Sequence, residues 1–165
     1  MNTIDIFTFK DGLLSRVAHD LQLRLERFEV SVNEEMVVGT FWPDSLEILG
    51  PVKRGKLDPG GLKKRDRADI KKNIQKDILH TRDHPVVKLE AKRLGNRLQG
   101  TLALRGRPRP ITIETQVRNQ RMEGEIELRP SLWGIPPFKA LMGAIKLQDR
   151  VLVRFSIALE SDKNT

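Results

Sequence analysis

Two histidines of this chain have the spacing of a metal site. His80 and His84 lie four residues apart, which places two imidazoles on one face of a helix. Pro85 disfavours helical backbone at His84, and no third ligand is obvious nearby, whereas catalytic zinc needs three protein ligands. We therefore predict the solvated end of a helix here and no metal site.

A second set of residues has the types needed to activate a nucleophile. His19 and Asp20 are adjacent, and Ser15 or Ser131 would complete the set. Neither serine has the glycine pattern of a nucleophile elbow, and adjacent residues on a strand point to opposite faces. The chain contains no cysteine, which excludes thiolate nucleophiles, disulfides and iron–sulfur clusters. The sequence thus predicts no catalytic residues, no cofactor and no enzymatic activity.

The length and composition of the chain are those of an ordinary globular protein. Its 165 residues are 38% hydrophobic and 32% charged, which suits one domain over residues 1–165 with a single core. Asp5, Lys10 and Asp11 interrupt the first apolar run, so we expect no secretory signal and a cytoplasmic location.

The positive charge is concentrated in one segment. Residues 53–76 carry ten basic and three acidic side chains, a net +7 of the chain's +8. This segment contains no aromatic side chain for base stacking, so nucleic acid is an unlikely partner. Two alternatives remain, a solvated face or a binding surface, for which anionic lipid headgroups compete with nucleic acid as the partner. The residues of the predicted anionic surface are Lys63, Lys64, Arg65, Arg67, Lys71 and Lys72.

Alternation of apolar and polar residues predicts about eight strands. They span residues 4–10, 21–32, 36–42 with an extension to 49, 86–94, 98–104, 111–117, 122–128 and 151–159. The apolar phase of the second strand changes near Glu26 and Arg27, which indicates a bulge or corner. Gly95-Asn96 predicts a tight hairpin, and the other connections are short as well, so neighbouring strands should pair antiparallel.

One helix interrupts this pattern. Leu62, Ile70, Ile74 and Ile78 recur at multiples of four, which predicts an amphipathic helix over 62–79 with a broad basic face. That face meets solvent or packs against a second copy in a homodimer, and both alternatives stay open. A shorter helical or irregular piece is expected over 137–141.

Eight amphipathic antiparallel strands avoid exposed edges by closing into a barrel. We therefore predict a mainly β fold, an antiparallel, roughly eight-stranded lipocalin-like barrel with one basic helix between the early and middle strands. A barrel of this size is either packed solid or holds one small ligand, and the composition is compatible with both.

Several segments, in order along nearly the whole chain, resemble the YceI-like family. The segment from Leu102 to Ile111, LALRGRPRPI, is similar to the family's hairpin L-x-L-x-G-x-x-R/K-P-V/I. Supporting segments are Val17-Ala-His-Asp-Leu21, Arg82-Asp-His-Pro-Val-Val-Lys-Leu89, Leu132-Trp-Gly-Ile135 and Gln148-Asp-Arg-Val151. The resemblance implies a lipocalin-like barrel around an apolar tunnel for a long-chain lipid, isoprenoid or quinone-type molecule, and a carrier without established catalysis.

Under this interpretation, the apolar phase of the strands assigns the ligand contacts. The inward residues are Leu21, Leu23, Phe28, Ile113, Met122, Ile126 and Phe155, with Trp133, Phe138 and Met142 at one end of the barrel. His19 or an arginine near the mouth would hydrogen-bond the polar head of the ligand. The apolar loop 133–138 is either a plug or the lip of the pocket.

Two functions follow from the sequence. The first is a lipid-binding barrel whose basic helix docks on an anionic membrane. The second is a solid barrel that uses the basic helix to bind an anionic partner, which is nucleic acid, an acidic protein or an anionic membrane.

Overall fold

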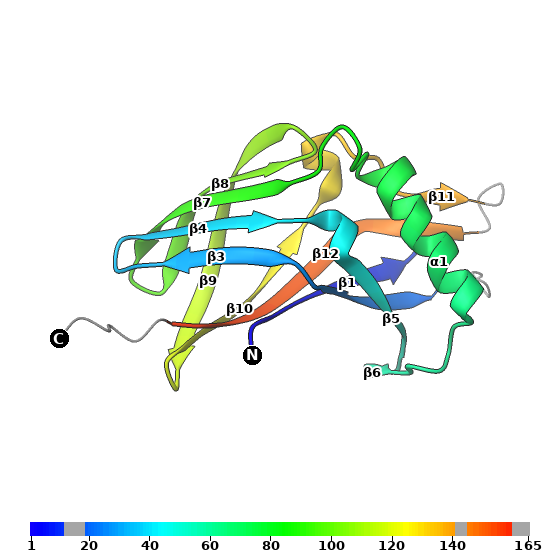
Figure 1. Cartoon of the computed structure of the whole chain (residues 1–165), viewed down its shortest axis with the longest axis horizontal. Coiled ribbons are helices and arrows are strands. Elements are labelled where there is room, and N and C mark those ends of the chain that lie inside the picture. Colours follow the sequence, from blue (N-terminus) through cyan, green and yellow to red (C-terminus); the bar gives the residue numbers. More distant parts are fainter. Residues whose placement is uncertain (12–18, 141–144, 160–165) are drawn as a thin grey trace.

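The computed structural model describes residues 1–11, 19–140 and 145–159, and within them it is mainly β (Figure 1). One α-helix, α1 (Lys64–Asn73), lies between the early and the middle strands. The strands are β1 (Thr3–Lys10), β2 (Asp20–Leu25), β3 (Phe28–Val32), β4 (Met36–Phe41), β5 (Leu46–Lys53), β6 (Lys56–Leu57), β7 (Val87–Leu94), β8 (Arg97–Leu104), β9 (Arg107–Arg118), β10 (Arg121–Leu128), β11 (Lys139–Ala140) and β12 (Ile145–Ala158).

The strands form one antiparallel sheet that curls on itself. Eleven of them follow the order β3-β4-β7-β8-β9-β10-β12-β1-β2-β5-β6, and β11 pairs with β12 beside this path. The order has two ends, β3 and β6, so the architecture is a curled sheet, or half-barrel. The prediction of a closed eight-stranded barrel is therefore wrong, although the mainly β, antiparallel class with one helix is confirmed.

The strand number is twelve and not eight because two predicted strands each bend into two, and because the two-residue strands β6 and β11 were not predicted. β2 and β3 are separated by Glu26 and Arg27, at the place where the apolar phase changes. The corner is held by hydrogen bonds, from the Arg27 backbone N to Ser45 Oγ at 2.8 Å and from the Trp42 backbone N to Arg27 O at 3.2 Å. Pro43–Ser45, a turn of 3₁₀ helix (η1), separates β4 from β5 opposite this corner. The predicted corner is confirmed.

Tight hairpins connect the middle strands. Gly95 and Asn96 join β7 to β8, as predicted, and Gly95 has a positive φ of 63°. Asn119 and Gln120 join β9 to β10 with φ values of 49° and 60°, a geometry that matches the twist of the paired strands. These hairpins place four consecutive strands side by side.

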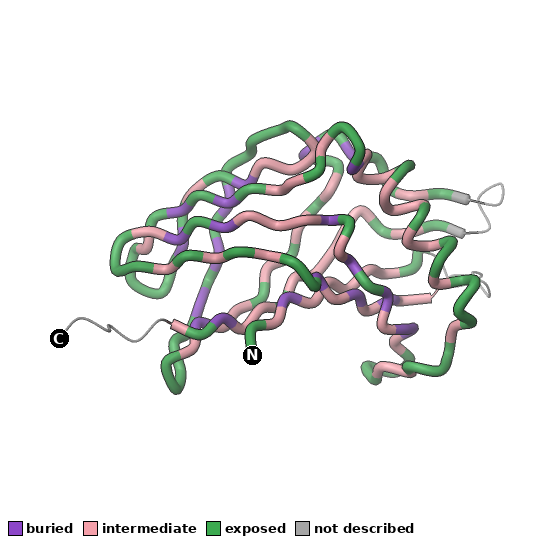
Figure 2. Tube along the Cα trace, viewed as in Figure 1, coloured by how far each residue is buried: buried purple, intermediate pink, exposed green. Residues whose placement is uncertain are grey.

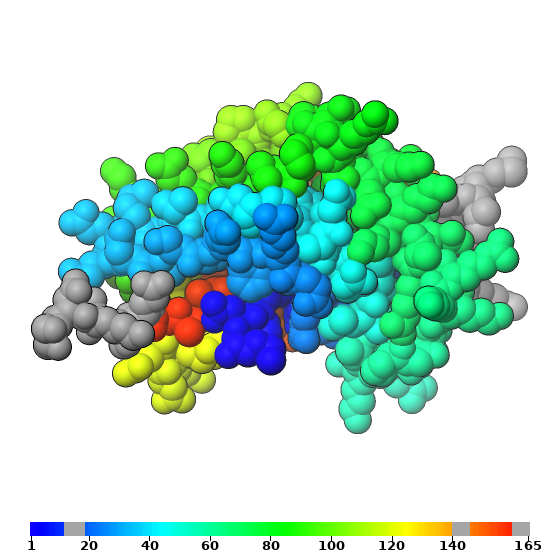
Figure 3. All heavy atoms as spheres, viewed as in Figure 1, coloured from blue at the N-terminus to red at the C-terminus, as the bar shows by residue number. Residues whose placement is uncertain are grey.

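The helical segment begins and ends close to the predicted limits. α1 starts at Lys64, and a π-helical turn, η2 (Ile74–Ile78), continues it. The segment lies at one end of the molecule, where Figure 3 shows it at the surface. Of the helical or irregular piece predicted over 137–141, Pro137 and Phe138 are irregular, Lys139 and Ala140 form β11, and residue 141 lies outside the described residues. A 3₁₀ turn, η3 (Pro130–Trp133), precedes this piece.

The buried side chains form two clusters on the concave side of the sheet. One cluster is built by β4, β7, β8, β9, β10 and η3, and the other by β1, β2, β5 and β12. Several half-buried residues, among them Phe41, Leu79 and Phe155, pack against both clusters. In Figure 2 the buried positions follow the strands, whereas α1 contains no buried residue. None of the described helices has both the length and the apolar character needed to cross a bilayer.

Candidate ligand-binding cavity

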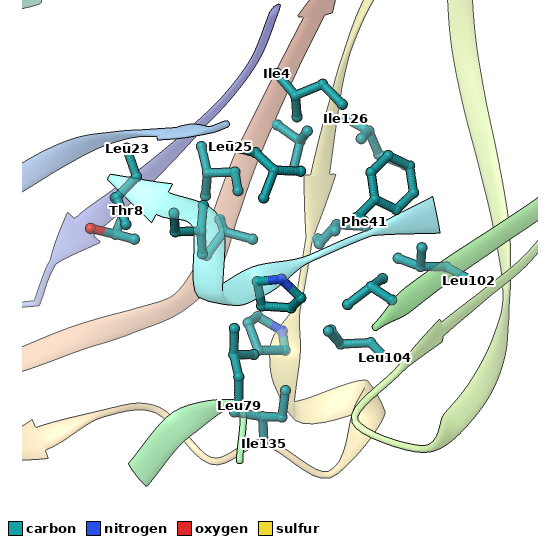
Figure 4. Close-up of a pocket in the computed structure, with 18 of the residues that line it drawn as sticks. Ile4, Thr8, Leu23, Leu25, Phe41, Leu79, Leu102, Leu104, Ile126 and Ile135 are labelled. Carbon is teal, nitrogen blue, oxygen red and sulfur yellow. The ribbon is translucent and has the colours of Figure 1, made fainter. Parts of the chain in front are cut away.

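A cavity of about 310 Å³ lies between the two core clusters. This volume is at the lower end of the range for small-molecule sites, roughly 300–1,000 Å³. The lining is almost entirely aliphatic and aromatic (Figure 4). Thr8 and Leu23 lie on one side of it, and Leu102 and Leu104 lie on the other. The site therefore suits an apolar ligand.

Strand alternation supplies most of the cavity wall. Successive side chains of a strand point to opposite faces, so every second residue of β1 and β12 faces the cavity. Ile4, Ile6 and Thr8 contribute from β1, and Val153 and Phe155 contribute from β12. Arg154, between the last two, lies on the outer face and pairs with Glu125 at 2.7 Å.

The helical segment completes the wall at one end of the cavity. Ile74, Ile78 and Leu79 line the cavity from η2 and the residue that follows it. On α1 itself, Ile70 packs against the core cluster of β1, β2 and β5. The apolar stripe predicted for this helix therefore faces the sheet and the cavity.

Six of the eleven predicted ligand contacts line the cavity. They come from five strands or loops and meet in one place, although they are far apart in the sequence. These residues are Leu23, Ile113, Met122, Ile126, Phe138 and Phe155. Their role in binding stays a prediction.

The other predicted contacts lie elsewhere. Leu21 is buried within the core cluster of β1, β2 and β5, and Phe28 packs against that cluster just after the corner. His19 is half-buried but is not part of the lining. Met142 falls outside the described residues.

Trp133 is part of the core rather than of the cavity wall. Its side chain is only 3% exposed, and its Nε1 donates a hydrogen bond of 2.9 Å to the backbone oxygen of Leu102. Ile135 and Phe138, in the same loop, do line the cavity. Within the loop 133–138, Trp133 therefore belongs to the core, whereas Ile135 and Phe138 belong to the cavity wall.

Few polar groups reach this cavity. Thr8, Gln148, Asp149 and Arg150 belong to the lining. Alternation along β12 places Gln148 and Arg150 on the outer face, where the Arg150 guanidinium lies 4.1 Å from the ring centre of Phe9. Thr8 and Asp149 therefore bring polar side chains to the inner face. Thr8 Oγ1 is buried and has no hydrogen-bond partner among the described residues.

Asp149 is held as a carboxylate by its neighbours. Burial raises its pKa, but hydrogen bonds from the hydroxyl and the backbone N of Ser131, the latter at 2.9 Å, have the opposite effect. Arg129 Nε lies 3.6 Å from the carboxylate and also favours its charged form. Together these contacts hold the pKa of Asp149 below its ordinary value, so it remains ionised at neutral pH.

The two histidines considered as metal ligands lie outside the cavity. His80 Nε2 is 3.3 Å from Arg105 Nη2, and the His84 ring lies close to Gly106. The described part of the chain contains no group of three or more His, Asp or Glu residues arranged to hold a metal ion.

The six residues of the predicted anionic surface are divided between two environments. Lys63, Lys64, Arg65 and Lys72 are exposed. Lys71 is half-buried and pairs with Glu47 on β5 at 2.7 Å, and the guanidinium of half-buried Arg67 donates to the backbone oxygen of Pro59. The side chains of Lys71 and Arg67 therefore contact other residues of this protein.

Several cavity residues were missed by the sequence analysis. Phe41, Leu79 and Leu104 are examples from three separate elements. The four-residue spacing of the predicted helix was a visible signal for Ile74 and Ile78. The alternation in residues 4–10 was a visible signal for Ile4 and Ile6. Phe41 shares the strand face of Val37, which also lines the cavity, but residues 36–42 are apolar on both faces, so their alternation assigned neither face to the cavity.

Comparisons with known proteins agree with this architecture. The model of the YceI-like domain family matches residues 16–159. The fold is similar to that of BcnA from Burkholderia cenocepacia, with a TM-score of 0.61, 13% sequence identity and 94% of each chain covered. It is also similar to a polyisoprenoid binding domain from Saccharophagus degradans implicated in plant cell wall breakdown, with a TM-score of 0.60, 10% identity, and coverage of 94% of this chain and 91% of that one.

A third solved structure is the YCEI protein of Campylobacter jejuni, with a TM-score of 0.50, 10% identity, and coverage of 77% of this chain and 76% of that one. No curated protein matches the sequence. At these identities the solved structures support the fold, and the family model supports the relationship. The resemblance seen in the sequence is confirmed, and this chain belongs to the YceI-like domain family.

Proposed function

We propose that this protein binds a long-chain apolar ligand, a polyisoprenoid, quinone-type or fatty-acyl lipid, inside its cavity and carries it without chemical change. The observation that carries this proposal is the cavity of about 310 Å³ with an almost wholly apolar wall. Burial of an alkyl or prenyl chain there would contribute roughly 0.8 kcal/mol per CH₂ group, before the costs of ordering the ligand. The related domain described as polyisoprenoid binding supports this ligand class.

The polar groups of the cavity suggest how the ligand is oriented. Thr8 Oγ1 is buried without a hydrogen-bond partner among the described residues, and a buried hydroxyl gains from any partner that a ligand supplies. We place the polar head of the ligand beside Thr8 and its chain toward Leu102 and Leu104, on the opposite side of the cavity. An ionised Asp149 disfavours an anionic head on the same side.

The alternative function, a solid barrel that binds an anionic partner, has less support. Its basic surface exists, because Lys64, Arg65 and Lys72 are exposed. Its scaffold is not solid, since the cavity separates the two core clusters. We therefore treat the basic surface as an accessory to ligand carriage. The cytoplasmic location stays a prediction.

The experiment has two arms. Native protein is extracted with organic solvent and the extract is analysed by mass spectrometry, and delipidated protein is then titrated with polyprenols of increasing length. Ile126→Trp is the matched control, because Ile126 lines the cavity and the indole would fill it. Equimolar prenyl, quinone or acyl species in the native extract that are missing from the control would support the proposal. So would saturable polyprenol binding at least about tenfold weaker in the control, a difference of 1.4 kcal/mol. A native extract without any such species, together with failure of the delipidated protein to bind any member of the series, would contradict it.

A further inference from the structure

A compact basic face lies on the outer side of the helical segment. We define the basic face as Lys64, Arg65, Lys72 and Lys76, all of which are exposed. Arg65 and Lys72 are seven residues apart, about two helical turns, so they lie one above the other. None of the four forms an ion pair with another described residue. Three exposed acidic residues lie beside these side chains, namely Asp69, between Arg65 and Lys72 along the helix, and Asp66 and Asp77.

The opposite side of the same segment is the cavity wall. Ile74, Ile78 and Leu79 line the cavity, and Leu62 and Ile70 pack against the core. A helix with its side chains is about 10–12 Å across. Whatever binds the basic face therefore lies about one helix diameter from the ligand cavity.

A second basic feature lies at the same end of the molecule. Lys139 on β11 and Lys146 on β12 are directly opposite each other in the antiparallel ladder, and both are exposed. Like charges opposite each other on paired strands are destabilising. Figure 1 shows β11 and α1 at the same end of the long axis. An anionic surface at this end would compensate both groups of positive charge.

The chemistry of the face favours anionic lipid among possible partners. Residues 53–79 contain no aromatic side chain, so bases of single-stranded nucleic acid would find no stacking platform. A second copy of the chain that met this face through a two-fold axis would oppose like charges. Basic residues near an anionic bilayer surface each contribute about 1 kcal/mol, with no need for a shaped site.

We propose that the basic face docks this protein on the anionic headgroups of a membrane, so that the helical wall of the cavity faces the lipid phase that supplies its cargo. The cargo part of this inference depends on the proposed function. Docking on the membrane does not depend on the proposed function, because docking needs only the charged surface. Figure 3 shows this segment, from teal to green, unobstructed at the surface of the view.

The test measures co-flotation of the full chain with phosphatidylcholine vesicles with and without phosphatidylglycerol. Wild-type protein should float with the anionic vesicles alone, and added salt should release it. Arg65→Glu with Lys72→Glu should bind at least about 30-fold more weakly, because loss of the two basic side chains alone removes about 2 kcal/mol. The matched control is Lys88→Glu with Lys92→Glu, which makes the same change in charge at exposed positions of β7.

The outcomes separate docking from net charge and from cargo binding. Equal weakening in both double variants would overturn the proposal, because total charge and not the basic face would then control binding. Equal flotation with neutral and anionic vesicles, or displacement from the vesicles by RNA, would also overturn it. The Arg65/Lys72 variant should retain its circular dichroism spectrum and its polyprenol affinity in solution. If polyprenol binding fails in every protein while anionic flotation persists, the proposed function fails and the docking surface stands.

Discussion

The indole nitrogen of Trp133 and the backbone oxygen of Leu102 are joined by a buried hydrogen bond of 2.9 Å. This bond ties η3 to β8, whose Leu102 side chain lines the cavity, and it fixes the loop that carries Ile135 and Phe138. Because both groups are buried, water would not replace this bond if it were lost.

Trp133→Phe should therefore lower the free energy of unfolding by about 1 kcal/mol, the contribution of one intramolecular hydrogen bond. The control is Trp42→Phe, since Trp42 is half-buried and contacts Arg27 through its ring face at 4.1 Å. Urea unfolding followed by far-ultraviolet circular dichroism measures both. Equal effects of the two substitutions would show that the hydrogen bond to Leu102 adds nothing.

The buried hydroxyl of Thr8 provides a test of ligand orientation. Thr8→Val removes Oγ1 and keeps a similar shape, so the unfolding free energy should be unchanged or slightly higher. Affinity for a polyprenol should fall about fivefold, the equivalent of one hydrogen bond of about 1 kcal/mol. Affinity for the matching hydrocarbon without a hydroxyl should stay the same. Titration of both ligands measures this, and equal losses for the two would place the polar head elsewhere.

Asp149 should contribute to the acid sensitivity of the fold. Its folded pKa lies below the ordinary value of 3.8, so its contribution to stability is complete above that pH and is lost as pH falls through the folded pKa. Ser131→Ala removes one hydrogen bond to the carboxylate and should cost about 1 kcal/mol at neutral pH. The difference between wild type and variant should shrink below pH 3.8. Urea unfolding across a pH series measures this, and a difference that does not change with pH would contradict the assignment.

The close approach of β7 and β8 depends on Gly100. A methyl group at this position would lie 1.9 Å from the backbone oxygen of Glu90 and 2.5 Å from Cα of Ala91. Gly100→Ala should therefore force the strands apart and cost about 1–3 kcal/mol, as overpacking does. Gly60→Ala is the control, since nothing lies within 4 Å of the added group there. Thermal unfolding compares them, and an equally stable Gly100→Ala protein would refute the prediction.

Periodicity in the sequence predicted the elements well because they are amphipathic. Strand alternation located β7, β8, β10 and β12, and the four-residue spacing of Ile70, Ile74 and Ile78 located the helix. Whether the sheet closes into a barrel was not predictable from periodicity. Whether a sheet closes depends on pairing between residues far apart in the sequence, which the local alternation does not report. The bend at Glu26-Arg27 was visible as a change of apolar phase.

Strand alternation also predicted part of the candidate site. Ile113, Met122 and Ile126 lie on regular strands, where alternation alone assigns a face. Trp133 and Phe28 lie on a turn and beside a corner, where the apolar residue type indicates burial but not which buried space it meets. Phe41 was missed because residues 36–42 are apolar on both strand faces, so alternation did not separate the cavity face from the other one.

The central claim is that a long-chain ligand occupies the space between the two core clusters. The most direct measurement is nuclear Overhauser contact between unlabelled geranylgeraniol and the ¹³C-methyl groups of Ile, Leu and Val in the labelled protein. The account predicts contacts to cavity methyls such as Leu104, Ile126 and Val153, and none to the exposed Val38, Leu94 and Val117. Contacts confined to the exposed methyls would contradict it, because the ligand would then bind the surface and not the cavity.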